Sequence, residues 1–292
     1  MRNACLRNAY HPGSPLPSDH GPVHGFTIDG ERAMTVGKTP IAIGWRVFGL
    51  SVAAMGVVNL ALGDFDPGQP VPDNFPARTA LAYAAALFLL VAGAATAWRR
   101  TASWGALALA TYYMLIVVIL MNGAVVLANN AVYGAYSTSA EMLAIAAAGL
   151  IVYAANASID ATLAARLTRI GQLTFGVCAL LFGGAHFFYL NLTVPFIPKW
   201  LPPSREFWAY ATGIAHIAGG IAILTGVQAR LAAILLTIMY ASFTPLVHIS
   251  TLLADPTSHF NWTENVLNLA LVGAAWVVAD SLARPRHQAA RE

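Results

Sequence analysis

Three histidines could carry chemistry in this chain, because each of them lies inside a long apolar stretch. Ionisable side chains are costly in apolar surroundings, so such residues are functional candidates. A neutral imidazole offers one hydrogen-bond donor and one acceptor, which suits a carbonyl or hydroxyl group of a quinone. We predict a ligand site from the histidines and the polar residues near them. The predicted ligand-binding residues are His186, His216, His248, Tyr210, Thr212 and Glu264.

The depths of the histidines favour one shared site. His186 and His248 lie about six and about five residues from the outer ends of their apolar stretches, and His216 lies about ten residues in. At a rise of 1.5 Å per helical residue, these depths differ by less than about 10 Å. The side chains can therefore converge in one cavity if they share an inward face.

Other readings of the histidines stay open. Each could be neutral and hydrogen-bonded within a helix bundle, for instance His216 with Thr212. Two of them could bind haem iron, but the chain has no Cys-x-x-Cys-His attachment motif. Three could bind a metal ion, but no ligand spacing in the sequence sets that geometry. We therefore predict a quinone or a similar lipophilic molecule as the ligand, place haem behind it, and predict no metal.

The elements that must position these residues are membrane helices. The chain is 58% apolar and only 10% charged, whereas about a quarter of the residues of soluble domains are charged. Runs of about 20 apolar residues are long enough to cross a bilayer as helices. Eight such runs lie near 41–63, 78–98, 104–127, 138–157, 168–192, 206–226, 230–253 and 264–282. We predict an all-α protein with eight transmembrane helices and the lipid bilayer as its partner.

The apolar part of the chain is written twice, with a constant offset of 127 residues. Matching positions include Pro76-Ala77-Arg78 and Pro203-Ser204-Arg205, Phe48-Gly49 and Phe175-Gly176, Gly56 and Gly183, Gly93 and Gly220, and Tyr113 and Tyr240. The histidines break this pattern, since Asn59, Leu89 and Met121 stand at the positions of the three histidines. The first copy therefore indicates what the fold requires, and the second copy what the site requires.

Four spans in each copy give both copies the same orientation, as two parallel four-helix repeats. We predict a disordered cytoplasmic segment at 1–37, repeats at 38–160 and 161–283, and a cytoplasmic tail at 284–292. Lys and Arg are enriched on the cytoplasmic side of membrane proteins. Of the sixteen Lys and Arg residues, twelve are expected on the side of the two termini, and Arg46 is expected near that side. Only Arg78, Lys199 and Arg205 are expected on the opposite side. Both termini are therefore predicted to face the cytoplasm of a bacterial-type inner membrane, and the basic balance is not evidence for nucleic acid.

Two features recur at the outer side of each copy. Proline-rich segments at 64–76 and 192–203 are predicted to lie flat over the mouth of their bundles, with a solvated loop as the alternative. Thr138-x-x-Glu141 and Asn261-x-x-Glu264 are predicted to cap the two fourth spans, because a capping residue followed by Glu satisfies free N–H groups at a helix start. The alternative for both glutamates is a carboxylate beside the histidines.

Several kinds of catalysis find no support. The chain has no Walker loop, no dinucleotide fingerprint and no Gly-x-Ser-x-Gly elbow. Its two cysteines, Cys5 and Cys178, are far apart in the sequence and form no Cys-x-x-Cys pair. Whether the chain is an enzyme is left open by its residues.

The second copy resembles the DoxX family of four-span membrane proteins. The resemblance is carried by Gly183-Gly-Ala-His186-Phe187, Ile197-Pro-Lys-Trp-Leu-Pro-Pro203, Thr212-Gly-Ile-Ala-His-Ile-Ala-Gly-Gly-Ile-Ala-Ile-Leu224, Arg230-Leu-Ala-Ala233 and Thr244-Pro-Leu-Val-His248. The chain departs from the family in having His216 where Glu is usual and in having two units. The resemblance implies a four-helix bundle per copy and a link to quinone-dependent oxidoreduction.

Three functions follow as hypotheses. The first is a membrane protein that binds a quinone or similar lipophilic molecule in its second repeat. The second is an accessory or assembly subunit of a larger membrane complex with no chemistry of its own. The third is a small-solute transporter, although no span is interrupted at mid-membrane by Gly-Pro in both copies.

Overall fold

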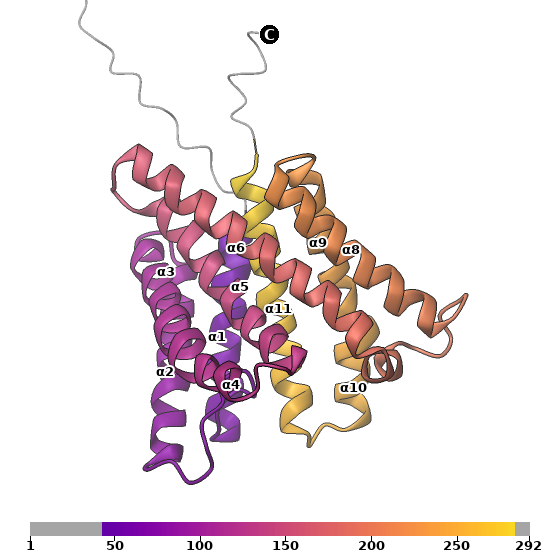
Figure 1. The fold of residues 1–292 in the computed structure, drawn as a ribbon. Coiled ribbons are helices and arrows are strands. Elements are labelled where there is room, and N and C mark those ends of the chain that lie inside the picture. Colours follow the sequence, from indigo (N-terminus) through magenta and orange to yellow (C-terminus); the bar gives the residue numbers. More distant parts are fainter. Residues whose placement is uncertain (1–42, 284–292) are drawn as a thin grey trace, which may run out of the picture. The chain divides into compact units, whose positions relative to one another are not determined.

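The computed structural model describes residues 43–283, which belong to the second of two compact units, Lys38–Glu292. The predictions for residues 1–37 and 284–292 lie outside the described residues. Within that range every regular element is a helix (Figure 1). The helices are α1 (Gly44–Leu62), α2 (Arg78–Ala97), α3 (Ala102–Thr111), η1 (Tyr112–Asn122), α4 (Gly123–Ala128), α5 (Tyr133–Asn156), α6 (Ala161–Phe188), α7 (Leu190–Thr193), η2 (Val194–Phe196), α8 (Arg205–Thr225), α9 (Ala229–Phe243), η3 (Thr244–His248), α10 (Ile249–Ala254) and α11 (His259–Ser281).

Eight helices among residues 43–283 are long and apolar enough to cross a membrane, which suggests a multi-pass membrane protein. The third and seventh of them are composite, formed by α3, η1 and α4 and by α9, η3 and α10. The spans agree with the apolar runs, but α6 begins at Ala161, before its apolar run. Asp160 caps this helix, accepting hydrogen bonds from the N–H groups of Thr162 at 2.9 Å and Leu163 at 3.1 Å. A capped polar turn thus extends the helix beyond the part that hydropathy detects.

The eight spans pack as a closed ring. Each contacts the next in the chain, from α1 to α2, α3, α5, α6, α8, α9 and α11, and α11 packs on α1 to close the ring. The backbone N–H of Gly44 donates to the carboxylate of Asp280 at 3.2 Å, which joins the start of α1 to the end of α11. The first and last spans therefore begin and end on the same side.

The fourth spans of the two halves contact each other across this ring. The helices α5 and α11 pack against each other. In Figure 1, α11 lies between α1 of the first half and α9 of the second half. In these two spans 61% and 72% of the residues of the apolar windows are buried, against 17–44% in the other six. Residues on α5 and α11 can therefore reach a site in either half.

Small residues bring neighbouring spans into close contact, as the glycine pattern predicts. A Cβ atom on Gly56 of α1 would lie 2.4 Å from the backbone N of Leu90 in α2. At the matching place in the second half, a Cβ on Gly183 of α6 would lie 2.7 Å from the carbonyl oxygen of Gly213 in α8. The two contacts bring helix backbones together in both halves.

The third span of each half contains a π-helical segment, η1 or η3. In η3, Pro245 lacks an N–H group, so a carbonyl group one turn earlier loses its usual partner. The side-chain amide of Asn268 in α11 donates to the carbonyl oxygen of Tyr240 at 3.1 Å and to the hydroxyl of Thr244 at 2.9 Å. Such replacement bonds are required where no water is available. The seventh span is thereby tied to α11 just before His248.

Replacing Asn268 with Leu should weaken this connection. The Tyr240 carbonyl would lose its interhelical donor in a buried place, at a cost of about 1–3 kcal/mol in the free energy of unfolding. We expect a lower melting temperature in detergent for Asn268→Leu. Asn129→Leu is the control, because Asn129 is exposed and its amide bonds only to the Val125 carbonyl of its own helix. Equal melting of the two variants would contradict the assignment.

Candidate functional site

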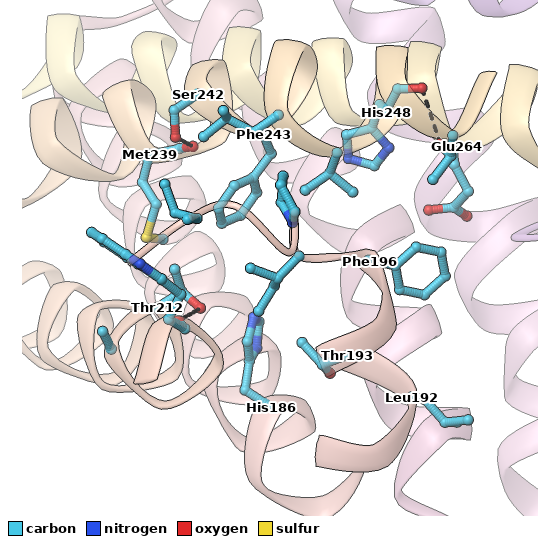
Figure 2. Close-up of a pocket in the computed structure, with 18 of the residues that line it drawn as sticks. His186, Leu192, Thr193, Phe196, Thr212, Met239, Ser242, Phe243, His248 and Glu264 are labelled. Carbon is cyan, nitrogen blue, oxygen red and sulfur yellow. Dashed lines mark hydrogen bonds between the residues drawn. The ribbon is translucent and has the colours of Figure 1, made fainter. Parts of the chain in front are cut away.

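A cavity of ≈ 670 Å³ lies in the second half, at the end of the ring opposite Gly44. Six parts of the chain form its wall: α5, the end of α6, the segment after it, α8, the seventh span and α11 (Figure 2). Phe196, Ile197 and Leu201 place the proline-rich segment 192–203 against this cavity, where the sequence predicted that it would cover the bundle. The volume lies within the range of about 300–1,000 Å³ typical of small-molecule sites.

Two of the three predicted histidines line this cavity together. Figure 2 shows His186 pointing into it from α6 and His248 pointing into it from the opposite wall. Nδ1 of His186 lies 2.9 Å from the carbonyl oxygen of Phe182, and since a carbonyl only accepts, this nitrogen carries the hydrogen. In the neutral ring Nε2 is then an acceptor. The His248 ring makes no hydrogen bond to the described residues, so both of its nitrogens are available to a ligand.

The third histidine, His216, lies behind the wall instead of on it. Its side chain is buried, and Nδ1 donates to the carbonyl oxygen of Thr212 at 2.7 Å. The ring centroid of His216 lies 5.0 Å from that of His186 and 5.4 Å from that of Tyr240. The hydrogen bond between His216 and Thr212 that the alternative reading expected exists, and it runs to the main-chain carbonyl. His216 can thus position His186 and does not itself face the cavity.

The remaining predicted residues divide between the cavity and the surface. Thr212 and Glu264 line the cavity, and the Thr212 hydroxyl donates to the Trp208 carbonyl of its own helix at 2.7 Å. Tyr210 lies outside, with 43% of its surface exposed and its ring 5.7 Å from that of Phe187. Helical periodicity explains this result, because residues two apart on a helix face different directions.

The prediction that Glu141 and Glu264 belong to capping motifs is wrong. Helix α5 begins at Tyr133, so Thr138 lies inside the helix and caps nothing. Helix α11 is capped by Ser258, whose hydroxyl accepts from the N–H of Asn261 at 3.2 Å. Both helices start earlier than the apolar runs suggest, and each glutamate therefore lies more than one turn inside.

Both glutamates line the cavity instead. Glu264 lies beside His248 in Figure 2. Glu141 comes from the fourth span of the first half, yet it reaches the cavity of the second half because α5 packs against α6 and α11. Sequence reasoning left Glu141 out of the predicted site. The sequence did contain a sign of it, since both fourth spans carry a Glu near their starts. That pattern fits a carboxylate beside the histidines as well as it fits a capping motif.

The first half contains a second cavity, of ≈ 790 Å³, that serves as an internal comparison. Its proline-rich segment 64–76 contributes to the wall, as 192–203 does in the second half. Matched lining residues 127 positions apart include Ala84 and Ala211, Ala85 and Thr212, Phe88 and Ala215, Ile116 and Phe243, and Met121 and His248. Apart from Tyr112 and Asn129, the side chains of this second cavity are apolar. The wall of this cavity thus lacks the imidazoles and carboxylates that line the cavity of the second half.

Comparison with known proteins points to the same half of the chain. A family described as a domain of unknown function (DUF8561) matches residues 175–279. The matched stretch contains all three histidines and Glu264, and it excludes the first half and Glu141. No curated protein and no solved structure matches the chain.

Within residues 43–283, no group of three or more His, Cys, Asp or Glu side chains is arranged to hold a metal ion. The three-histidine metal alternative therefore gains no support from the described residues. Hydrogen bonding and proton exchange with an uncharged, mostly apolar molecule are the chemistry that this wall can provide.

Proposed function

We propose that this chain is a DoxX-like integral protein of the cytoplasmic membrane that binds a quinone, or a similar lipophilic molecule, in the cavity of its second half. The single observation that carries the proposal is the contrast between the two cavities. Both are of similar size, but only one has His186, His248, Glu141 and Glu264 in its wall. Because polar groups at membrane depth are costly, a function is the best explanation for keeping them.

The chemistry of the wall fits a quinone head group. Nε2 of His186 can accept a hydrogen bond from a quinol hydroxyl, and His248 can donate to a quinone carbonyl or accept from a hydroxyl. The apolar side chains of Phe196, Ile197 and Leu246 suit a ring and the beginning of an isoprenoid tail. We therefore assign ligand orientation to the histidines and link the chain to membrane oxidoreduction through this ligand.

Features that recur in the two halves support a tandem duplication with parallel repeats, in which the two cavities occupy equivalent places. The matched lining residues, the π-helical segments in both third spans and the paired glycine contacts all recur in the two halves. Since each half has an even number of spans, the halves run in the same direction across the bilayer. The first half then acts as the fused partner of the ligand-binding half.

The charge distribution supports cytoplasmic termini. The side on which α1 begins and α11 ends carries Arg46, Arg99, Arg100, Arg166, Arg169 and Arg230, and the opposite side carries Arg78, Lys199 and Arg205. By the positive-inside rule, the first side faces the cytoplasm. The histidine-containing cavity then lies near the outer surface.

The test is ligand extraction from the purified protein combined with a variant that fills the cavity. Ala215 lines the cavity at the place where the first half has Phe88, so Ala215→Phe introduces a residue that the fold accepts in the matching position. We expect quinone in lipid extracts of the wild type, measured by mass spectrometry, and at least a tenfold weaker affinity in Ala215→Phe, equivalent to about 1.4 kcal/mol.

Ala218→Phe is the matched control, because Ala218 is exposed one turn along α8 and does not line the cavity. Equal quinone content in wild type and Ala215→Phe would remove the proposal. An extract without quinone, together with stoichiometric co-purification of larger subunits, would favour the accessory-subunit function. Solute uptake by reconstituted vesicles would favour the transporter.

A further inference from the structure

The hydroxyl residues in the wall of the second-half cavity share one feature, which is that their donor hydrogens are already used. These residues are Thr193, Thr212, Ser242 and Thr251. Each hydroxyl donates to a main-chain carbonyl three or four residues earlier, over 2.7–3.1 Å. A carbonyl oxygen can only accept, so the hydrogen of each hydroxyl is directed at its own helix. The oxygen of each hydroxyl keeps lone pairs for a ligand, as an acceptor.

The nitrogen donors of the wall are used in the same way. Nε1 of Trp208 donates to a main-chain carbonyl at 2.8 Å. Both hydrogens of the Asn261 amide go to main-chain carbonyls, at 3.1 and 3.2 Å, and its oxygen remains an acceptor. Nδ1 of His186 donates to a further carbonyl at 2.9 Å, so Nε2 of the neutral ring only accepts. Among the nitrogen-containing side chains that line the cavity, only His248 therefore keeps an N–H group for a ligand.

The rest of the wall adds more acceptors than donors. Among the described residues that line the cavity, none is Lys, Arg or Tyr. In the segment after α6, the N–H groups of Ile197 and Leu201 donate to main-chain carbonyls, and Pro198 has no N–H. The carboxyl groups of Glu141 and Glu264 each have two oxygens and at most one hydrogen. The wall thus accepts hydrogen bonds from a ligand at more places than it donates them.

The acceptors lie at two opposite places in the cavity. His186 and Thr212 are neighbours on one side, because a Cβ atom on Gly213, the next residue, would lie 2.9 Å from Cβ of His186. Thr251 lies on the other side, since its hydroxyl bonds to the carbonyl of His248, which faces His186 across the cavity in Figure 2. Most of the remaining lining side chains are apolar. A ring with a hydroxyl group at each end suits this arrangement.

The first half shows that these hydroxyls are not needed for the fold. Ala85 and Ala124 line the cavity of the first half at the positions that match Thr212 and Thr251, 127 residues earlier. At two matched places the second half therefore carries an acceptor where the first half has a methyl group. A requirement of the ligand explains this difference better than a requirement of helix packing does.

We propose that the cavity selects its ligand by the hydrogens that the ligand donates, and that it binds the reduced, hydroxyl-bearing form of a quinone in preference to the oxidised form. This rests on the proposed function in one respect, that the ligand is a quinone-type molecule. A quinol has two hydroxyl hydrogens for the acceptors of the wall, whereas the two carbonyl oxygens of a quinone can only accept. Against a wall of acceptors, a carbonyl loses its bonds to water without replacement. The oxidised form is therefore released more readily than the reduced form.

The first experiment is a titration of the delipidated full-length protein in detergent with a decyl benzoquinone and with the matching quinol, kept reduced under argon. We expect the quinol to bind at least about tenfold more tightly than the quinone. A decyl phenol and its methyl ether form a second pair, which differs in a donor hydrogen without a change of redox state. We expect the phenol to bind more tightly than the ether.

The outcomes separate this inference from the proposed function. Equal or tighter binding of the quinone relative to the quinol, or of the ether relative to the phenol, overturns the selection by donor hydrogens and leaves quinone binding standing. Tighter binding of the phenol than of its ether, with no binding of quinone or quinol, removes the proposed function and keeps the selection. Binding of none of the four probes removes both.

The second experiment replaces hydroxyls in the cavity with methyl groups. The double variant Thr212→Val with Thr251→Val should weaken quinol binding about tenfold and change quinone binding by less than about twofold, because only the quinol donates to these oxygens. Thr225→Val with Thr237→Val is the matched control. The hydroxyls of Thr225 and Thr237 also donate to carbonyls four residues earlier, at 2.8 Å, but neither residue lines the cavity. Wild-type selectivity in the cavity variant, or an equal loss in the control, overturns the inference.

Discussion

Replacing the three histidines with the residues at the matching positions of the first half is expected to weaken ligand binding strongly and to leave the protein folded. The variant combines His186→Asn, His216→Leu and His248→Met. The fold already contains these residues: Asn59 and Leu89 are buried in the first half, and Met121 lines its cavity. The substitution therefore removes imidazoles without introducing an untested side chain.

The expected loss of affinity follows from the hydrogen bonds to the ligand. Removing two imidazole partners from polar groups in an apolar cavity costs about 1–3 kcal/mol for each group left unsatisfied. The affinity for quinone should fall roughly 100-fold, measured by titration of the delipidated protein. Met121→Leu, in the other cavity, should bind as the wild type does. Wild-type affinity in the triple variant would show that the histidines do not hold the ligand.

The second large effect is expected for Gly183→Ala, which should lower both stability and ligand binding. A Cβ atom here would lie 2.5 Å from Cγ1 of Ile217, 2.7 Å from the carbonyl oxygen of Gly213 and 3.1 Å from Cβ of His216. The carbonyl belongs to a helix backbone, so the contact is relieved only if α6 and α8 move apart. That movement displaces His186 and Thr212. We expect a loss of about 1–3 kcal/mol, typical of overpacking.

Two alanine variants separate packing from function. Gly56→Ala, at the matching place in the first half, meets backbone atoms of Leu90 and Ala86 at 2.4–2.8 Å and should be equally destabilising. In its folded fraction, however, quinone affinity should be retained. Gly123→Ala meets only the Val118 carbonyl, at 3.4 Å, and should change stability little. Thermal melting and quinone titration measure both effects, and wild-type melting of Gly183→Ala would refute the close contact.

The sequence predicted the elements better than their ends. Apolar runs identify spans well, because crossing a bilayer requires about 20 residues of apolar helix. They do not identify first turns that are less apolar than the rest of the helix, and the helix starts at Ala161, Tyr133 and His259 were therefore expected too late. The late starts in turn made Glu141 and Glu264 look like capping residues. One error of helix boundary thus concealed one residue of the site.

The sequence by itself determined that residues 43–283 form eight long apolar helices and that the second half carries the three histidines within them. Both facts follow from composition along the chain, which needs no knowledge of neighbours. Only the tertiary structure decided that His216 lies behind the cavity, that Tyr210 faces outward, and that Glu141 crosses from the first half to the second. These helices are apolar on most sides, so their sequences do not encode which face turns inward. The direction of each side chain is set by the packing of the helices on one another, including the contact of α5 with α11 across the ring, and that packing joins residues far apart in the chain.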